Sequence, residues 1–195
     1  MRSTSWQPMR ERQVSSSRAE PPTQAPVVAE AVLVTGVYGV GKSTVVAQLA
    51  DLLEARGHRY AALDLDWLAW ADDGVHDSHT DQVMLLTNLA SVVGNYRALG
   101  IERFVLAGWV GDAGELEGLR STMDMPVHVV RLTLGYEEII RRSGPGQNTG
   151  RADDMTQTAA WLAAGAGEGL EDLAIPNEAP ALDVATTILA WMGWS

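Results

Sequence analysis

The sequence of 195 residues contains no cysteine. This absence excludes disulfide bridges and thiolate metal sites. No apolar run approaches the roughly 20 residues that a membrane-spanning helix needs, and the first residues lack the apolar core of a signal peptide. We therefore expect a cytoplasmic protein that has access to ATP and Mg²⁺ and makes no membrane contact.

Lysine is almost missing as well. Lys42 is the only lysine in a chain with 14 basic residues, and all the others are arginine. A composition that uses arginine everywhere else indicates that position 42 needs a compact ammonium group, which a guanidinium cannot replace.

Basic residues are also few relative to the 25 acidic ones, so the net charge is −11. Residues 1–28 contain four arginines and two glutamates, which leaves −13 for the rest of the chain. A domain this acidic repels a nucleic-acid backbone, so we do not expect duplex nucleic acid as a partner.

The single lysine lies in Gly36-Val37-Tyr38-Gly39-Val40-Gly41-Lys42-Ser43, which is followed by Thr44. This matches the P-loop pattern G-x-x-x-x-G-K-[ST]. The three glycines can take backbone angles that turn successive N–H groups inward around an anion. Lys42 adds a charge for the β- and γ-phosphates, and the Ser43 hydroxyl is placed to bind Mg²⁺. The predicted nucleotide ligands here are Gly36, Tyr38, Gly39, Val40, Gly41, Lys42, Ser43 and Thr44.

Strand and helix patterns alternate along the rest of the chain. We predict strands at 31–35, 59–66, 103–108, 127–134 and 173–175, and helices at 43–56, 81–99, 113–121, 136–143, 152–164 and 182–191. This alternation predicts an α/β fold, a single P-loop NTPase domain over 29–195 with a doubly wound, five-stranded parallel sheet. Residues 1–28, rich in Ser, Pro, Gln and Arg, read as a flexible leader.

Asp64 and Asp66 lie at the end of the second predicted strand. Side chains two residues apart on a strand share a face, so both carboxylates can point towards the phosphates. One can help to hold Mg²⁺, and the other can orient an attacking hydroxyl and accept its proton. A solvated strand end is the alternative.

The third predicted strand ends at Ala107 and Gly108, where many P-loop proteins have an acidic Mg²⁺ ligand. That role would therefore fall to Asp64, to Asp66 or to water. Trp109 is either a core residue or a wall of the substrate pocket. Asp112 is a reserve candidate for the base, although capping the helix that follows is its more natural role.

A loop rich in Gly, Pro and Asn, residues 144–150, is bordered by Arg141, Arg142 and Arg151. We interpret residues 141–152 as a short lid over the triphosphate. Arg141 and Arg151 are candidate catalytic residues that would stabilise the transferring phosphoryl group, and Arg142 is a candidate nucleotide ligand. The alternatives are a surface turn and, for Arg151, an ion pair within its helix.

Two further groups remain open. His76 and His79 have a spacing that a transition metal could use, but Ser78 or Thr80 as a helix cap is the better interpretation. Trp67 and Trp70 belong either to the core or to a stacking wall for a planar or sugar-like substrate.

The P-loop, the Asp64-x-Asp66 strand end and the arginine-flanked lid together resemble the small P-loop kinases. This group includes shikimate, gluconate, adenylylsulfate and nucleoside-monophosphate kinases and chloramphenicol phosphotransferases. The segment Leu-Asp-Leu-Asp-Trp-Leu at 63–68 also resembles that of actinobacterial P-loop proteins. The resemblance implies that Asp64 lies near Mg²⁺, that Asp66 meets the acceptor hydroxyl, and that Asn177 lies in the loop around the adenine.

The sequence thus predicts a kinase that uses ATP and Mg²⁺ to phosphorylate a hydroxyl of a small-molecule acceptor. The alternatives are a nucleotide-dependent switch or regulatory ATP-binding protein, an inactive binding module, and a nucleoside or nucleotide kinase. The choice between ATP and GTP stays open. Trp and Met side chains on helix faces would allow a homodimer.

Overall fold

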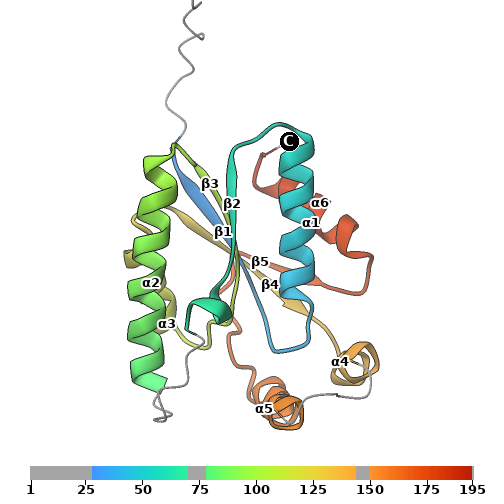
Figure 1. Cartoon of the computed structure of the whole chain (residues 1–195). Coiled ribbons are helices and arrows are strands. Elements are labelled where there is room, and N and C mark those ends of the chain that lie inside the picture. Colours follow the sequence, from blue (N-terminus) through green and yellow to red (C-terminus); the bar gives the residue numbers. More distant parts are fainter. Residues whose placement is uncertain (1–27, 70–77, 144–149, 195) are drawn as a thin grey trace, which may run out of the picture.

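A computed structural model describes residues 28–69, 78–143 and 150–194 of the chain (Figure 1). The predicted leader up to residue 27, the segment with Trp70 and His76, and the centre of the predicted lid lie outside the described residues. The leader therefore stays a prediction.

Five parallel strands form one sheet in the order β2-β3-β1-β4-β5, which confirms the predicted doubly wound α/β fold. The strands are β1 (Glu30–Thr35), β2 (Tyr60–Asp64), β3 (Arg103–Ala107), β4 (Val127–Thr133) and β5 (Leu173–Pro176). β1 pairs with β3 on one side and β4 on the other. The strand order therefore reverses beside β1, and in such sheets ligands bind at the carboxyl ends of the strands at this point.

Helices cover both faces of the sheet (Figure 1). The helices are α1 (Lys42–Ala55), α2 (Ser78–Ala98), α3 (Ala113–Met123), α4 (Tyr136–Ser143), α5 (Gly150–Ala164) and α6 (Ala181–Trp191), with a short 3-10 helix η1 (Leu65–Leu68) after β2. In the part of the chain that the structure describes, no helix is long and apolar enough to cross a membrane.

The alternation of side chains along β1 separates two cores. Val32 and Val34 pack with α1 and α6 on one face, whereas Ala31 and Leu33 pack with α2 and α3 on the other. All four residues are fully buried. A strand that is apolar on both faces is expected at the centre of a parallel sheet that helices cover on both sides.

The prediction for the second strand was wrong at its end. β2 stops at Asp64, and the next four residues form η1 instead of continuing the strand to Asp66. The Asp64 side chain accepts a hydrogen bond from the backbone N–H of Asp66, so it caps the turn that ends the strand. Competition of this kind between a short acidic side chain and the strand ladder is common at Asp.

Asp112 caps α3, as predicted. Its Oδ1 accepts hydrogen bonds from the backbone N–H groups of Gly114 (2.8 Å) and Glu115 (2.9 Å). Glu115 in turn accepts a hydrogen bond from the N–H of Gly111 at 2.7 Å. This arrangement resembles a capping box, except that Glu115 bonds the N–H of the residue before the N-cap, and it ties the loop after β3 to the first turn of α3.

Replacement of Asp112 by Ala should lower the free energy of unfolding by about 1 kcal/mol, because two N–H groups of the first turn lose their acceptor. Urea denaturation measures the change. Glu117→Ala is the matched control, since Glu117 is an exposed carboxylate of the same helix without a capping role. Equal stability of the two variants would contradict the capping assignment.

Candidate functional site

The loop of residues 36–43, called the P-loop from here on, joins β1 to α1 in a conformation that requires glycine. Gly36 and Gly41 have φ angles of 136° and 104°. A Cβ atom would lie 2.6 Å from the carbonyl oxygen of Leu132 at the first position and 2.7 Å from Nδ2 of Asn177 at the second. Both positions therefore exclude a side chain on steric as well as conformational grounds.

Lys42 begins α1 and is only 8% exposed. Its Nζ donates hydrogen bonds to the carbonyl oxygens of Gly36 (3.0 Å) and Val37 (3.4 Å), so the ammonium lies under the loop. Burial lowers the pKa of Lys42, and the charges of Asp66 and Asp64 oppose this effect. No side chain caps the N-terminus of α1, which leaves its first N–H groups and the helix dipole for an anion.

Ser43 and Asp64 join the P-loop to the end of β2. The Ser43 hydroxyl donates a hydrogen bond of 2.6 Å to Oδ2 of Asp64. The two groups offer adjacent oxygen atoms, and Mg²⁺ in nucleotide sites binds such oxygens together with phosphate and water. This pair fits the predicted Mg²⁺ site. Among the described residues, no group of three or more His, Asp or Glu side chains could hold a metal ion by itself.

Asp66 lies in η1 and lines the same cavity as the P-loop. It keeps contact with solvent, but partial desolvation by the surrounding protein raises its pKa. The charge of Lys42 lowers this pKa, and that of Asp64 raises it. The prediction that both carboxylates share one strand face was wrong, since the turn after Asp64 separates them. The turn nevertheless keeps both close enough to Lys42 to act on its charge.

The glycine that follows β3, Gly108, lies where there is no room for a side chain. A Cβ atom at Gly108 would lie 2.7 Å from Cδ1 of Leu65, which is itself buried in η1. An acidic side chain cannot occupy this position while Leu65 fills the space. The packing of Leu65 therefore gives a steric reason for glycine at position 108.

Two tryptophans from distant parts of the chain stack on each other. The rings of Trp109 and Trp161 are stacked, with centroids 4.4 Å apart and an interplanar angle of 14°. Both pack against the core on the α1 side of the sheet, and neither is among the residues that line the P-loop cavity, so the structure supports the core interpretation of Trp109. Trp67, in contrast, is 68% exposed, which excludes the core interpretation for this residue.

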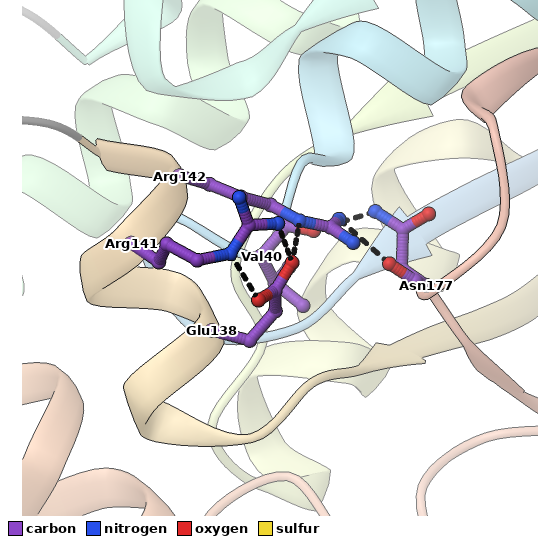
Figure 2. A network of polar contacts seen from close by, with 5 residues as sticks. All are labelled: Val40, Glu138, Arg141, Arg142 and Asn177. Atoms are coloured by element: carbon purple, nitrogen blue, oxygen red, sulfur yellow. Dashed lines mark hydrogen bonds and ion pairs between the residues drawn. The ribbon is translucent and has the colours of Figure 1, made fainter.

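α4 contributes a network of hydrogen bonds and ion pairs (Figure 2). Nη1 of Arg142 donates a hydrogen bond of 2.7 Å to the carbonyl oxygen of Asn177, and Nε donates one of 2.7 Å to Glu138. Asn177 is buried, and its Nδ2 donates a hydrogen bond of 2.7 Å to the carbonyl oxygen of Val40 in the P-loop. The network therefore connects α4 to the P-loop through the segment between β5 and α6.

The predicted lid arginines have different environments. Arg142 lines the cavity, whereas the Arg141 side chain is 71% exposed and pairs with Glu138 outside the cavity lining. The side chain of Arg151 lies outside the described part of the chain. The structure thus brings Arg142, but not Arg141, to the P-loop.

These elements enclose one cavity of about 520 Å³. Its lining residues are Tyr38, Gly39, Val40, Gly41, Lys42, Ser43, Thr44, Asp66, Arg142, Asn177, Ala179 and Ala181. Every predicted nucleotide ligand except Gly36 is in this set. The carbonyl oxygen of Gly36 instead accepts a hydrogen bond from Lys42. The volume is in the range of small-molecule sites.

Sequence reasoning missed Glu138 and Ala181. Glu138 stands three and four residues before the two arginines, a spacing that predicts ion pairs on a helix and was open to detection. Ala181 gives no comparable signal, because a methyl group has no chemistry that marks it as a lining residue.

No protein-family model matches the sequence, and no curated protein sequence matches it significantly. Solved structures do match the fold. A sugar kinase from Janibacter sp. is 18% identical with a TM-score of 0.63, and the match covers 85% of this chain and 95% of that one. The APS kinase of Mycobacterium tuberculosis, solved with AMPPNP and APS, is 18% identical with a TM-score of 0.57, over 86% and 99% of the chains.

The shikimate kinase of Acinetobacter baumannii, solved with shikimate, is 21% identical with a TM-score of 0.52, over 86% and 94% of the chains. The chain has the fold of the small P-loop kinases. Identities of this size establish the shared fold, and the predicted resemblance to the small P-loop kinases is confirmed at that level. The chain spans nearly the whole length of these P-loop kinases.

Replacement of Gly41 by Ala should abolish the P-loop conformation, because the new Cβ meets Asn177 in addition to the unfavourable φ. We expect ADP to bind at least about tenfold more weakly, the equivalent of about 1.4 kcal/mol. Isothermal titration calorimetry measures the change.

Gly57→Ala is the matched control, since Gly57 also has a positive φ, of 73°, but a Cβ there meets nothing within 4 Å. It should lose about 1–2 kcal/mol of stability and keep nucleotide affinity. Equal ADP affinity in the Gly41 variant and the wild type would contradict the assignment of the P-loop as the phosphate site.

Proposed function

We propose that this protein is an ATP-dependent phosphotransferase that moves the γ-phosphoryl group to a hydroxyl of a small-molecule acceptor. One observation carries the proposal. The P-loop serine is hydrogen-bonded to one carboxylate, Asp64, and a second carboxylate, Asp66, lines the same cavity two residues later. The fold shared with sugar, APS and shikimate kinases supports the same reaction class.

The phosphates would lie on the P-loop. The uncapped N-terminus of α1 supplies N–H donors, and Lys42 can exchange its two loop carbonyls for the β- and γ-phosphate oxygens. Ser43 and Asp64 would hold Mg²⁺, directly or through water, and the ion supplies positive charge for the developing phosphate oxygens.

The adenine ring would lie between Arg142 and the methyl groups of Ala179 and Ala181, which line the cavity together with the P-loop. A planar guanidinium and an apolar surface suit the two faces of a purine ring. Asn177 would stabilise this part of the cavity, because its side chain joins the segment before α6 to the P-loop.

Asp66 would act on the acceptor. In the proposed step the acceptor oxygen forms a bond to the γ-phosphorus, the bond from that phosphorus to the β,γ-bridging oxygen breaks, and ADP leaves. The hydroxyl proton passes to the Asp66 carboxylate. The raised pKa of Asp66 makes it a stronger base than an ordinary aspartate.

The charge of the chain favours a neutral or cationic acceptor. Residues 60–96, which run from β2 into α2, contain no lysine or arginine. The same segment contains Asp64, Asp66, Asp72, Asp73, Asp77 and Asp81. An anionic acceptor beside Asp66 would be repelled by its carboxylate, so a neutral or amine-bearing hydroxylated compound is the better candidate.

A nucleotide-dependent switch is the second candidate. The absence of an acidic residue at Ala107 and Gly108 favours it, because that residue helps to hold Mg²⁺ in many P-loop proteins. The contact of Leu65 with Gly108 and the pairing of Asp64 with Ser43 weaken this argument. We therefore prefer the kinase to the switch as the proposed function.

An acceptor that serves as substrate should stimulate ADP release from ATP and Mg²⁺, and Asp66→Asn should reduce the stimulated rate by about 10²–10⁴-fold while ADP affinity is retained. A coupled assay with a panel of hydroxylated sugars, amino sugars, nucleosides and antibiotics measures this. Asp51→Asn, an exposed aspartate of α1, is the matched control and should behave as wild type. Slow ADP release whose rate does not change with any acceptor or with either substitution would favour the nucleotide-dependent switch.

The stimulated activity should also depend on the protonation of Asp66. As the pH falls through the pKa of Asp66, the carboxylate gains a proton and can no longer accept one, so kcat/KM falls. Because desolvation raises this pKa, the midpoint of the acid limb should lie above the ordinary aspartate value of about 3.9. A pH–rate profile, with circular dichroism to follow folding, tests this. A midpoint at or below the ordinary value would contradict the role of Asp66 as base.

A further inference from the structure

Glu138 forms the centre of the ion-pair network but does not line the cavity. Its two carboxylate oxygens accept hydrogen bonds from Nε (2.6 Å) and Nη2 (2.5 Å) of Arg141, and Oε1 also accepts one from Nε of Arg142 (2.7 Å). These two arginines hold the pKa of Glu138 at about 2, so the carboxylate stays ionised across the physiological range.

Arg142 is held at two points. Glu138 fixes its Nε, and the carbonyl oxygen of Asn177 fixes its Nη1. Two hydrogen bonds from different nitrogens of one planar group define the orientation of that plane. Figure 2 shows the guanidinium of Arg142 extended from α4 towards Asn177, with Glu138 beside it.

The same bonds set where Arg142 lies relative to the P-loop. Asn177 donates to the carbonyl oxygen of Val40 and, through its backbone N–H, to that of Thr133 in β4 at 2.8 Å. Asn177 is thus fixed by the P-loop and by the sheet. The hydrogen bond to Asn177 therefore sets the distance between the guanidinium of Arg142 and the P-loop. The position is complete only if Nε of Arg142 is held as well, and Glu138 holds it.

We propose that Glu138 is a positioning residue that orients Arg142 for binding of the adenine nucleotide. The inference rests on the proposed function in taking a nucleotide as the ligand of the cavity. Glu138 acts through Arg142 and without contact to the ligand. A long side chain that is already oriented loses less conformational freedom on binding, so the affinity is higher.

The charge balance of the network suits this role. One carboxylate between two guanidiniums leaves one net positive charge beside the cavity, so the network still attracts a triphosphate. Arg141 pairs with Glu138 outside the cavity lining, and the hydrogen bond that Nε of Arg142 donates to Oε1 of Glu138 does not depend on it. The alternative is that Glu138 only screens positive charge, and then its removal should strengthen nucleotide binding.

The test is a double-substitution cycle read out by titration calorimetry with ADP and with AMPPNP. Glu138→Ala should weaken both ligands by about 5–10-fold, and Arg142→Ala at least as much. In the Arg142→Ala background, Glu138→Ala should have no further effect, because a positioning residue has nothing left to orient. Glu138→Gln, which keeps an acceptor oxygen, should recover part of the affinity.

Arg141→Ala is the matched control, since it removes an arginine from the same carboxylate but leaves Arg142 bound; we expect less than about a twofold change. Once an acceptor substrate has been identified, Glu138→Ala should raise KM for ATP and leave kcat nearly unchanged. Unchanged melting temperatures of the Glu138→Ala and Glu138→Gln proteins would show that a folding defect does not cause the loss of affinity.

Additive effects of Glu138→Ala and Arg142→Ala, tighter binding after Glu138→Ala, or an equal loss in Arg141→Ala would each overturn the inference. These outcomes are separable from the proposed function. A cycle that behaves as expected while no acceptor supports transfer would refute the kinase and leave Glu138 as a positioning residue. Acceptor-dependent transfer together with additive effects of the two substitutions would support the kinase and refute the positioning role of Glu138.

Discussion

The close contact between the P-loop and its neighbours is the constraint on which the rest of the site depends. Gly36 lies against the backbone of β4, and Gly41 lies against the buried amide of Asn177. Since neither contact leaves room for a Cβ atom, the loop packs directly on β4 and on Asn177, and its position follows from theirs. The strand order places this loop where β1 lies between β3 and β4. The dipole of α1, the ammonium of Lys42 and the Ser43–Asp64 pair are all fixed relative to it.

Charge is distributed unevenly around that loop. The chain as a whole is strongly acidic, yet the cavity contains the only lysine and one oriented arginine. Local cations in an acidic domain favour a small anionic ligand that can enter a cleft over an extended polyanion that must lie on the surface. Hydrogen bonds hold both cations: Lys42 donates to the carbonyl oxygens of Gly36 and Val37, and Arg142 donates to Glu138 and to the carbonyl oxygen of Asn177.

Much of this arrangement could be predicted from the sequence, and the failures have physical causes. The P-loop spacing and the alternation of strands and helices gave the sheet and the residues at the phosphate site. The end of β2 was misplaced because Leu63 and Leu65 continue the strand pattern, while the Asp64 side chain turns the backbone. The pairing of Trp109 with Trp161 joins residues far apart in the chain, and no local pattern encodes it. The role of Leu65 in excluding a side chain at Gly108 likewise depends on tertiary packing.

The single lysine has a further consequence for chemistry at this site. Apart from the amine of the first residue, Lys42 carries the only primary amine of the chain, and its burial lowers its pKa and so increases the share of the nucleophilic neutral form. An amine-directed reagent therefore meets one side chain in the protein, and that side chain lies under the P-loop. The extent of covalent labelling at this position would therefore report whether the P-loop cavity is occupied, and the amine of the first residue is the only other amine that would compete for the reagent.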